Sequence, residues 1–318
     1  MMSTVWSAAK AAISTPLALI EQRHLRAAPG LAAAPIFIIS LPRSGSTLFY
    51  LLLTRYFRLT YFSNLASRFP TAPTAVSVAM KRFGSVAPPP DLRSYYGNTF
   101  HWNSPSQAYQ VWNRWLDPSL DYIAPESLDA RAVREMRATI GQFQARLGGP
   151  FCSKWQRHLP RLRALAAAFP EAVFIYLERA AASTAQSLLA GRREFLGDEA
   201  AWLSARPSSY QPAAADTPID QVCRQVCHLR DDAERYMSVI GRDRFLSTRY
   251  EAVCRAPAAV LDEFADWYRT KTGVTLVRRG TTLPPLSVAE KPKLSQDECA
   301  RIVDTLARLG SGERRRDR

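Results

Sequence analysis

The segment that most constrains the fold is residues 34–53, with the sequence APIFIISLPRSGSTLFYLLL. Residues 36–39 form an unbroken run of β-branched and aromatic side chains, which is typical of a parallel strand buried on both faces. Pro42 ends that strand because proline has no N–H group to donate to a neighbouring strand. Small hydroxyl residues follow, and then an apolar stretch with good helix formers over residues 48–53. A strand, a loop and a helix in this order favour phosphate binding, because they direct backbone N–H groups at one point.

The loop after this strand is close to the Walker A pattern GxxxxGK[ST], and its differences from that pattern are informative. Gly45 and Thr47 match the pattern, but Ser46 stands where a lysine would contact the β- and γ-phosphates. A cation is present earlier, at Arg43, on the turn itself. The loop therefore predicts a cradle for one phosphate with a group attached, rather than a site of nucleoside triphosphate hydrolysis. A plain strand–turn–helix unit with a polar turn is the alternative interpretation.

Strand-like and helix-like patterns alternate along the rest of the chain. We predict strands over residues 57–62, 150–155, 172–177 and 244–248, and helices over 75–83, 128–147, 159–169, 180–189, 219–240 and 257–268. This alternation indicates βαβ units, and hence an α/β fold of three layers with a central, mostly parallel sheet flanked by helices. Ligands of such folds bind at the carboxyl ends of the strands. Polar clusters follow Ile39, Cys152 and Leu177 at just these ends.

The formal net charge of +14 requires an explanation. Nucleic acid is one candidate partner for a basic chain, but the arginines are scattered except in residues 310–318, so we expect no nucleic acid partner. A highly anionic cofactor or substrate, or peripheral contact with an anionic membrane surface, would also suit the charge. No apolar run approaches the roughly 20 residues that span a bilayer, and no secretory signal stands out, so we expect a cytoplasmic enzyme.

The five cysteines show no spacing typical of a disulfide framework, which favours reduced thiols. Cys223 and Cys227 are four residues apart in a helical stretch, and His228 is adjacent. Two thiols and one histidine could bind zinc, but the sequence offers no evident fourth ligand, so a buried helix face is the favoured interpretation. We therefore predict no metal site.

Three blocks of the sequence resemble the sulfotransferase family, in the order and spacing of that family, from residue 35 to about residue 300. LPRSGST resembles the loop that binds a 5′-phosphosulfate group. LPRLRALAAAFPEAVFIYLERAAASTAQSLL is similar to the 3′-phosphate block, in which a strand ends in arginine and serine follows eight residues later. RYEAVCRAPAAVLDEFADWY is similar to a third family segment. The resemblance implies a P-loop-type fold and the donor 3′-phosphoadenosine-5′-phosphosulfate (PAPS), and it requires no metal.

The resemblance also implies which residues hold the donor. Its 5′ end would be bound by the loop residues Arg43, Ser44, Gly45, Ser46 and Thr47. Arg179 and Ser187 would offer a cation and a hydroxyl to the 3′-phosphate, although a structural salt bridge is an alternative for the arginine. Arg192 could add a second cation there or lie on a solvated helix surface. Tyr250 could contact the donor or be a half-buried tyrosine at a strand end.

Sulfuryl transfer requires in-line positioning and cations directed at the oxygens on which charge develops. By resemblance, Arg43 stabilises the leaving oxygen and Lys154 contacts the transferring sulfuryl oxygens. The acceptor also needs a general base, a role that suits histidine. His158, in a His-Leu-Pro segment, is preferred slightly to His101, and either could instead be structural. Asn64 stands in the place of a glutamate used by another branch of the family, and it cannot take a proton.

The chain departs from the family pattern at two places. Residues 180–182 are alanines, where the family usually has Asp-Pro or Asn-Pro after the strand arginine. The Gly-x-x-Gly-x-x-Lys tail of the small-molecule branch is absent from the sequence. Charges that could substitute for it, or be solvated loop residues, are Arg278, Arg279, Lys291 and Lys293.

We expect three parts in the chain: a helical extension over residues 1–33, one sulfotransferase-like domain over 34–310, and a disordered basic tail over 311–318. Residues 70–150 would form a variable insertion on the acceptor side. The acceptor would be a hydroxyl-bearing or amine-bearing glycan, lipid or small molecule, and nothing in the sequence indicates the oligomeric state. Two alternative functions are a phosphotransferase or nucleotide kinase, which should carry a Walker lysine, and a non-catalytic nucleotide-binding protein, which would need neither Lys154 nor a base.

Overall fold

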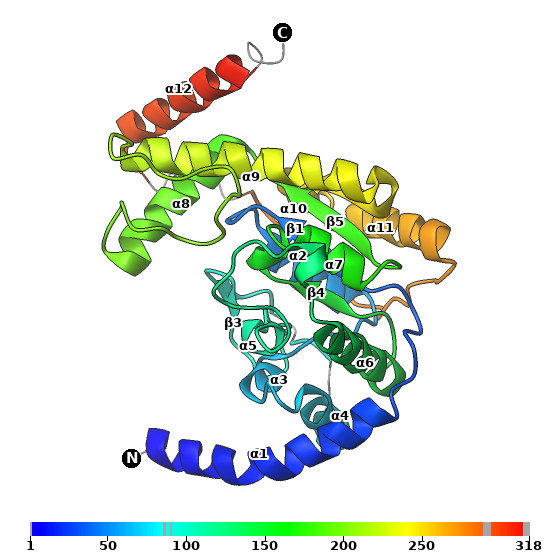
Figure 1. Ribbon diagram of the computed structural model, residues 1–318. Helices are drawn as coiled ribbons and strands as arrows, with labels where there is room; N and C mark the ends of the chain where they lie inside the picture. The colour runs from blue at the N-terminus through cyan, green and yellow to red at the C-terminus, as the bar shows by residue number, and fades with distance from the viewer. Residues whose placement is uncertain (1, 85–86, 90, 289–293, 314–318) are drawn as a thin grey trace.

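A four-stranded sheet forms the centre of the computed structural model, which describes residues 2–84, 87–89, 91–288 and 294–313 (Figure 1). Its strands are β1 (Ile36–Ser40), β4 (Cys152–Lys154), β5 (Val173–Glu178) and β6 (Phe245–Arg249). Their spatial order is β4-β1-β5-β6, and each neighbouring pair runs parallel. The predicted parallel sheet is confirmed, and it brings the carboxyl ends of the four strands to one edge.

The two faces of this sheet carry separate hydrophobic clusters, because alternate side chains of a strand point to opposite faces. Phe37 and Phe174 belong to one cluster, whereas Ile38 and Ile175 belong to the other. The first face is covered by α6 (Ala130–Leu147), α7 (Leu162–Ala168), α8 (Ala181–Leu196) and α9 (Pro218–Ile240). The second face is covered by α2 (Ser46–Tyr56), α10 (Tyr250–Arg255) and α11 (Pro257–Thr272). Helices on both sides give the three layers that the alternation predicts.

The N-terminal helix α1 (Met2–Arg26) packs against α4 (Pro73–Phe83) and α6. The buried Glu21 carboxylate accepts hydrogen bonds from the backbone N–H groups of Thr74 (3.2 Å) and Ala75 (2.7 Å), in the first turn of α4. A carboxylate there satisfies N–H groups that a helix start leaves unpaired. The remaining elements are α3 (Asn64–Arg68), α5 (Tyr109–Trp112), α12 (Gln296–Glu313), the hairpin of β2 (Ser94–Tyr95) and β3 (Asn98–Thr99), and three short 3-10 turns at Pro125–Ser127, Gln156–His158 and Arg242–Arg244.

The strand predicted over residues 57–62 is wrong. This segment is extended beside β4 but forms only isolated bridges, from Phe57 to Arg278 and from Thr60 to Phe151. Its backbone hydrogen bonds are divided among three stretches of chain: the N–H of Arg58 donates to the carbonyl of Val277, that of Thr60 to the carbonyl of Pro150, and the carbonyl of Phe62 accepts from the N–H of Ser106. No single partner runs alongside it for long enough to build a ladder. Residues 57–63 are called the edge segment below.

Several element ends also differ from the sequence-based expectation. The helix predicted over 180–189 continues as α8 to Leu196 and ends at Gly197, which has a left-handed φ of 64°. Tyr250 begins α10 and is not a strand end. Residues 311–313 of the expected tail belong to α12, and 314–318 lie outside the described residues. Within the described part of the chain, no helix combines the length and the apolar character needed to cross a membrane.

Candidate functional site

The predicted phosphate loop connects β1 to α2 at the carboxyl edge of the sheet. Arg43 has a φ of 65° and Gly45 a φ of 79°, so both adopt the left-handed region. For an arginine this conformation costs on the order of 1 kcal/mol, and such strain gathers at functional turns. The Ser44 hydroxyl donates to the carbonyl of Leu41 (2.9 Å) and closes the turn. No side chain caps α2, so the N–H groups of its first turn, which starts at Ser46, remain suited to an anion.

Tyr250, the first residue of α10, packs directly on this turn. A Cβ atom on Gly45 would lie 2.2 Å from Cδ2 of Tyr250, so glycine is required at this position for steric reasons as well as for its φ. The guanidinium of Arg179 lies over the same tyrosine ring, 4.8 Å from its centroid. Tyr250 therefore lies between the loop and the arginine that was predicted to bind the 3′-phosphate.

The two predicted anion sites are joined by direct hydrogen bonds. Nη1 of Arg179, just beyond the end of β5, donates to the carbonyl of Arg43 (2.9 Å). Nε of Arg43 donates to the hydroxyl of Ser187 on α8 (3.1 Å). Nε of Arg179 is buried and has no hydrogen-bond partner in the described part of the chain. The structure thus brings Arg43, Arg179 and Ser187 together, and it leaves a buried cationic donor unsatisfied among them.

Lys154 ends β4 next to the loop. Its side chain is 1% exposed, and its Nζ donates to the hydroxyl of Thr47 in the first turn of α2 (3.1 Å). Burial, together with the charge of Arg43, lowers the pKa of Lys154 to about 7. A lysine with this pKa is divided between its charged and neutral forms near neutral pH, and a negative charge beside it favours the charged form.

The three cations of the site have no acidic partners within ion-pair distance. Among the described residues, no Asp or Glu forms an ion pair with Arg43, Lys154 or Arg179. Buried cations are normally paired, because removing a charge from water is costly. We refer to these three residues with Ser187 and the loop as the anion cradle. Its chemistry suits a ligand that carries more than one negative group.

A short hairpin that sequence reasoning missed covers the cradle. Tyr96, in its turn, lies under the Arg43 guanidinium, with 4.1 Å between the carbon of that group and the ring centroid. The hydroxyls of Tyr95 and Tyr96 both donate to the carboxylate of Glu194 on α8. A Cβ atom on the adjacent Gly97 would lie 3.7 Å from the hydroxyl oxygen of Thr47, so this turn reaches the loop itself. The signal in the sequence was the Tyr-Tyr-Gly-Asn turn between two short strand-forming stretches.

His158, the general base preferred from the sequence, is enclosed in the core on the other face of β4, and this burial does not favour that assignment. It is fully buried, and its Nε2 shares a hydrogen bond with the hydroxyl of Ser153 (3.0 Å). The rings of Phe37 and Trp112 meet it edge to face. Burial lowers its pKa well below the ordinary value. Because Ser153 and Lys154 are consecutive in β4, they point to opposite faces of the sheet, and His158 is a core residue of the other face.

Arg192 also lies away from the cradle, contrary to the suggestion that it binds the 3′-phosphate. It is fully buried, and its Nη1 donates to the carbonyl of Glu199 (2.9 Å) and to Oε1 of Gln221 (2.8 Å). Its Nη2 donates to Oε1 of Gln225 (3.3 Å). Five residues after Ser187 on a helix, its side chain points to a different side of α8. Its hydrogen bonds join α8 to α9.

His101 lies on the surface beside the hairpin. Its Nε2 is 2.7 Å from a carboxylate oxygen of Asp91, and its carbonyl accepts a hydrogen bond from the side chain of Asn64 (2.8 Å). It lines a cavity of about 560 Å³ together with Asn64, Thr99 and Gln107. Gly97, which reaches the phosphate loop, lines the same cavity. His101 thus lines a cavity that reaches the phosphate loop through Gly97, whereas His158 is enclosed in the core although the charge of Lys154 acts on it.

The remaining candidates lie outside the cradle. Arg278 forms an ion pair with Asp262 (2.6 Å), and Arg279 binds carbonyls at the far end of α2. Lys291 and Lys293 lie outside the described residues. Cys223 is buried in the core, and His228 stacks on Tyr210. Among the described residues, no three His, Cys, Asp or Glu side chains are grouped as a metal would require.

Comparisons with known proteins agree with this fold. A family model described as "Sulfotransferase family" matches residues 35–271. The crystal structure of sulfotransferase STF9 from Mycobacterium avium has a TM-score of 0.52 at 16% identity, covering 92% of this chain and 72% of that one. Sulfotransferase STF1 from Mycobacterium tuberculosis H37Rv has a TM-score of 0.51 at 15% identity, covering 92% and 81%. At these identities the structural likeness shows the fold alone. No curated protein matches the sequence.

Proposed function

The chain belongs to the sulfotransferase family, and from this membership we propose that it transfers a sulfuryl group from PAPS to a hydroxyl or amine acceptor. The observation that carries the proposal is the anion cradle, in which hydrogen bonds link Arg43 to Arg179 and Ser187 and link Lys154 to Thr47 of the loop, and none of the three cations forms an ion pair among the described residues. The donor fits such a site, because it carries negative groups at both ends of its adenosine. The unpartnered buried Nε of Arg179 is the donor group that a phosphate oxygen would satisfy.

Each cradle residue has a part in this proposal. Arg179 and Ser187 hold the 3′-phosphate, and the loop with the start of α2 holds the 5′ end. When bound, the donor supplies the activated sulfuryl group. Arg43 stabilises the charge that develops on the leaving oxygen, and Lys154 contacts the transferring sulfuryl oxygens. The hydrogen bond from Arg43 to Ser187 (3.1 Å) places one cation at the border of both anion sites.

The proposed acceptor side is the cavity beside the hairpin. His101 and Asn64 line it, and Gly97 connects it to Thr47 of the loop. His101 is the general base that we now propose, with Asp91 orienting its ring through the contact at 2.7 Å. Glycans, lipids and small alcohols all carry a hydroxyl that this cavity could receive.

The test of this function is transfer of labelled sulfate. The purified protein is incubated with radiolabelled PAPS and with lipids, glycans and metabolites fractionated from the source cells. We expect label in one fraction, and a large reduction of that label with the Lys154→Met variant. If the protein binds the desulfated donor, 3′-phosphoadenosine 5′-phosphate, but labels no fraction, the non-catalytic binding protein becomes the better account.

A further inference from the structure

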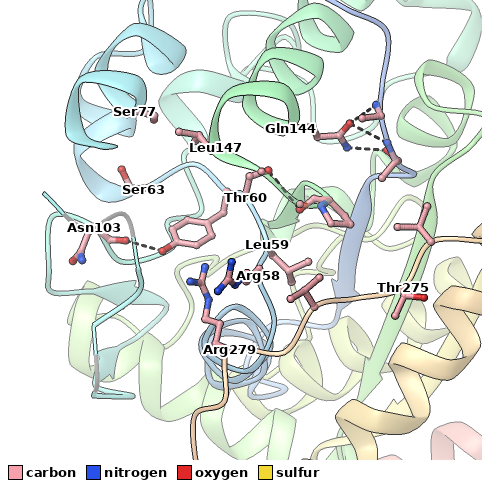
Figure 2. A pocket seen from close by; sticks show the side chains of 18 of the residues that line it. Arg58, Leu59, Thr60, Ser63, Ser77, Asn103, Gln144, Leu147, Thr275 and Arg279 are labelled. Carbon is pink, nitrogen blue, oxygen red and sulfur yellow. Dashed lines mark hydrogen bonds between the residues drawn. The ribbon is translucent and has the colours of Figure 1, made fainter. Parts of the chain in front are cut away.

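A cavity of about 610 Å³ lies at the end of α2 that is remote from the phosphate loop (Figure 2). Its wall includes Arg58 to Tyr61 of the edge segment, residues 148–150 before β4, and Ala32 and Ala33 before β1. Val277 and Arg279, from the chain after α11, complete this side. The segments before β1 and β4 enter the amino ends of those strands, whereas the anion cradle lies at the carboxyl ends. The cavity is therefore a separate place in the molecule.

Arg279 shows how far the cavity lies from the cradle. Its Nε donates to the carbonyls of Thr54 (3.1 Å) and Phe57 (3.0 Å), where α2 ends. A cation suits this end of a helix because the terminal carbonyls carry partial negative charge. At about 1.5 Å per residue, the 11 residues of α2 separate this end from the loop by roughly 16 Å. Nε of Arg279 thus binds the end of α2, and the two Nη atoms of its guanidinium remain available to a ligand in the cavity.

A second cation shares the cavity with Arg279. Figure 2 shows the guanidinium groups of Arg58 and Arg279 side by side. The charge of Arg58 adds to burial in lowering the pKa of Arg279, as expected for neighbouring like charges. Among the described residues, neither arginine forms an ion pair, and no Asp or Glu lines the cavity. Two cations that face one cavity repel each other until an anion lies between them.

The adjacent Arg278 provides an internal contrast. Its guanidinium pairs with the carboxylate of Asp262 at 2.6 Å, outside the cavity. The fold thus places an acidic side chain beside Arg278, whereas it places a second arginine beside Arg279. The local sequence is basic in both cases, so the difference lies in what the tertiary structure brings to each side chain.

The rest of the wall suits an organic molecule of modest size. Leu59, Met80, Leu147 and Val277 supply apolar surface. The polar side chains are mostly committed within the protein: the amide of Gln144, for example, binds the backbone of Ala32 (2.8 Å) and Ala33 (2.8 Å). The volume lies within the range of about 300–1,000 Å³ that is usual for small-molecule sites. Recognition here would come from the two cations and from apolar contact.

We propose that this cavity is a second binding site, for a small organic anion whose charged oxygens lie on Arg58 and Arg279 and whose apolar body packs on Leu59, Met80 and Val277. A sulfate ester and a carboxylate share the chemistry that the two guanidinium groups recognise. The proposal is independent of the sulfuryl transfer proposed above, because none of its residues belongs to the anion cradle.

The test measures binding of four probes to the full chain by titration calorimetry: octyl sulfate, octanoate, octanol and inorganic sulfate. We expect one of the two charged amphiphiles to bind at least about tenfold more tightly than octanol, which lacks the charge, and than inorganic sulfate, which lacks the body. Whichever charged probe binds better identifies the head group. Equal binding of octanol and both charged probes would overturn the proposal.

Two variants locate the site. Arg58 is exposed and its side chain makes no hydrogen bond in the described structure, so the Arg58→Ala variant should fold normally. We expect it to bind the charged probe at least about tenfold more weakly than the wild-type protein does. As a control, Arg301→Ala removes an equal charge from the exposed surface of α12 and should leave the affinity for the charged probe unchanged. Binding of 3′-phosphoadenosine 5′-phosphate should be unchanged in both variants. Unaltered probe binding to Arg58→Ala would refute the site.

A charge reversal adds a second readout, the melting temperature, which does not depend on the choice of probe. Arg58→Glu places a carboxylate beside Arg279, where the proposal puts the anion of a ligand. We expect this variant to lose binding of the charged probe and to melt at a higher temperature than the wild-type protein. A lower melting temperature together with retained binding would show that the two cations do not form an anion site.

Discussion

The two faces of β4 hold two buried ionisable side chains in opposite surroundings. Lys154 ends the strand on the face of α2, where it meets the hydroxyl of Thr47 and the charge of Arg43. Ser153 points to the other face, where it holds His158 among aromatic rings. Both ionisable groups are almost completely buried, and burial lowers the pKa of each.

The difference shows that burial alone does not identify a functional residue. His158 has a neutral hydrogen-bond partner and is enclosed by apolar rings, so the neutral form of its imidazole is favoured there. Lys154 lies beside Arg43, and neither side chain forms an ion pair in the described structure, so an anion would stabilise the charge of both. Ser153, which binds His158, and Lys154 are consecutive residues of β4, so their side chains point to opposite faces of the sheet. This difference of one position places the histidine in the core and the lysine in the cradle.

The largest expected effect concerns the lysine. Lys154→Met keeps the volume and removes the charge, and we expect kcat to fall by about 10²–10³, the usual cost of losing one donor to a developing charge. Steady-state kinetics with the identified acceptor would measure this. If His158→Phe lowered kcat as much as Lys154→Met does, the contrast between the two faces would be refuted.

The two cradle arginines should separate turnover from binding. Arg43→Ala should lower kcat far more than donor affinity, because its charge acts on the leaving oxygen. Arg179→Ala should mainly weaken binding, by about 10- to 100-fold, because it removes a charge-assisted hydrogen bond to a phosphate. Kinetics and calorimetry on both variants would provide the comparison. An equal loss of affinity in both would contradict the assigned roles.

Donor binding should depend on pH through Lys154. With a pKa of about 7 in the free protein, this lysine is mostly neutral above that pH, and the charge of a bound anion raises its pKa. Binding then takes up a proton, so affinity for 3′-phosphoadenosine 5′-phosphate should fall by up to about tenfold per pH unit above 7. Below pH 7 the lysine is already charged, and its contribution to the pH dependence should vanish. Lys154→Met should show a flatter profile, and an unchanged slope in that variant would exclude the lysine as the cause.

The smallest effect on activity should come from the histidine. His158→Phe leaves the buried Ser153 hydroxyl without its partner, which should lower the free energy of unfolding by about 1–3 kcal/mol. Denaturant titration would measure the loss. We expect kcat at a temperature where the variant is folded to stay within about threefold of the wild-type value, as for a substitution that removes no contact made in the transition state.

The sequence predicted the features that depend on local chemistry. The buried runs that became β1 and β5, the loop at Arg43, and the arginine that ends a strand eight residues before Ser187 all carry their signal in consecutive residues. The edge segment was misassigned because its composition is strand-like while its backbone hydrogen bonds are divided among three stretches of chain. The composition of a segment does not reveal how many residues of a neighbouring strand will pair with it.

The site was predicted less completely, for a geometric reason. The His-Leu-Pro segment suggested His158 as a base near Lys154, and the spacing from Ser187 suggested Arg192 as a second cation at the 3′-phosphate. In the structure, His158 binds Ser153 on the opposite face of β4 from Lys154. Arg192 points from a different side of α8 than Ser187 and binds Gln221 of α9. The hairpin with Tyr96 lies far from the loop in sequence, so its place over Arg43 is a property of the tertiary structure.

The central claim is that the anion cradle is built for a donor with phosphates at both ends of an adenosine, and one binding measurement tests it most directly. Titration calorimetry would compare 3′-phosphoadenosine 5′-phosphate with ATP–Mg²⁺ on the wild-type protein. We predict that 3′-phosphoadenosine 5′-phosphate binds at least about tenfold more tightly, because Arg179 and Ser187 contact a 3′-phosphate that ATP lacks. Tighter binding of ATP–Mg²⁺ would contradict the account and favour a phosphotransferase.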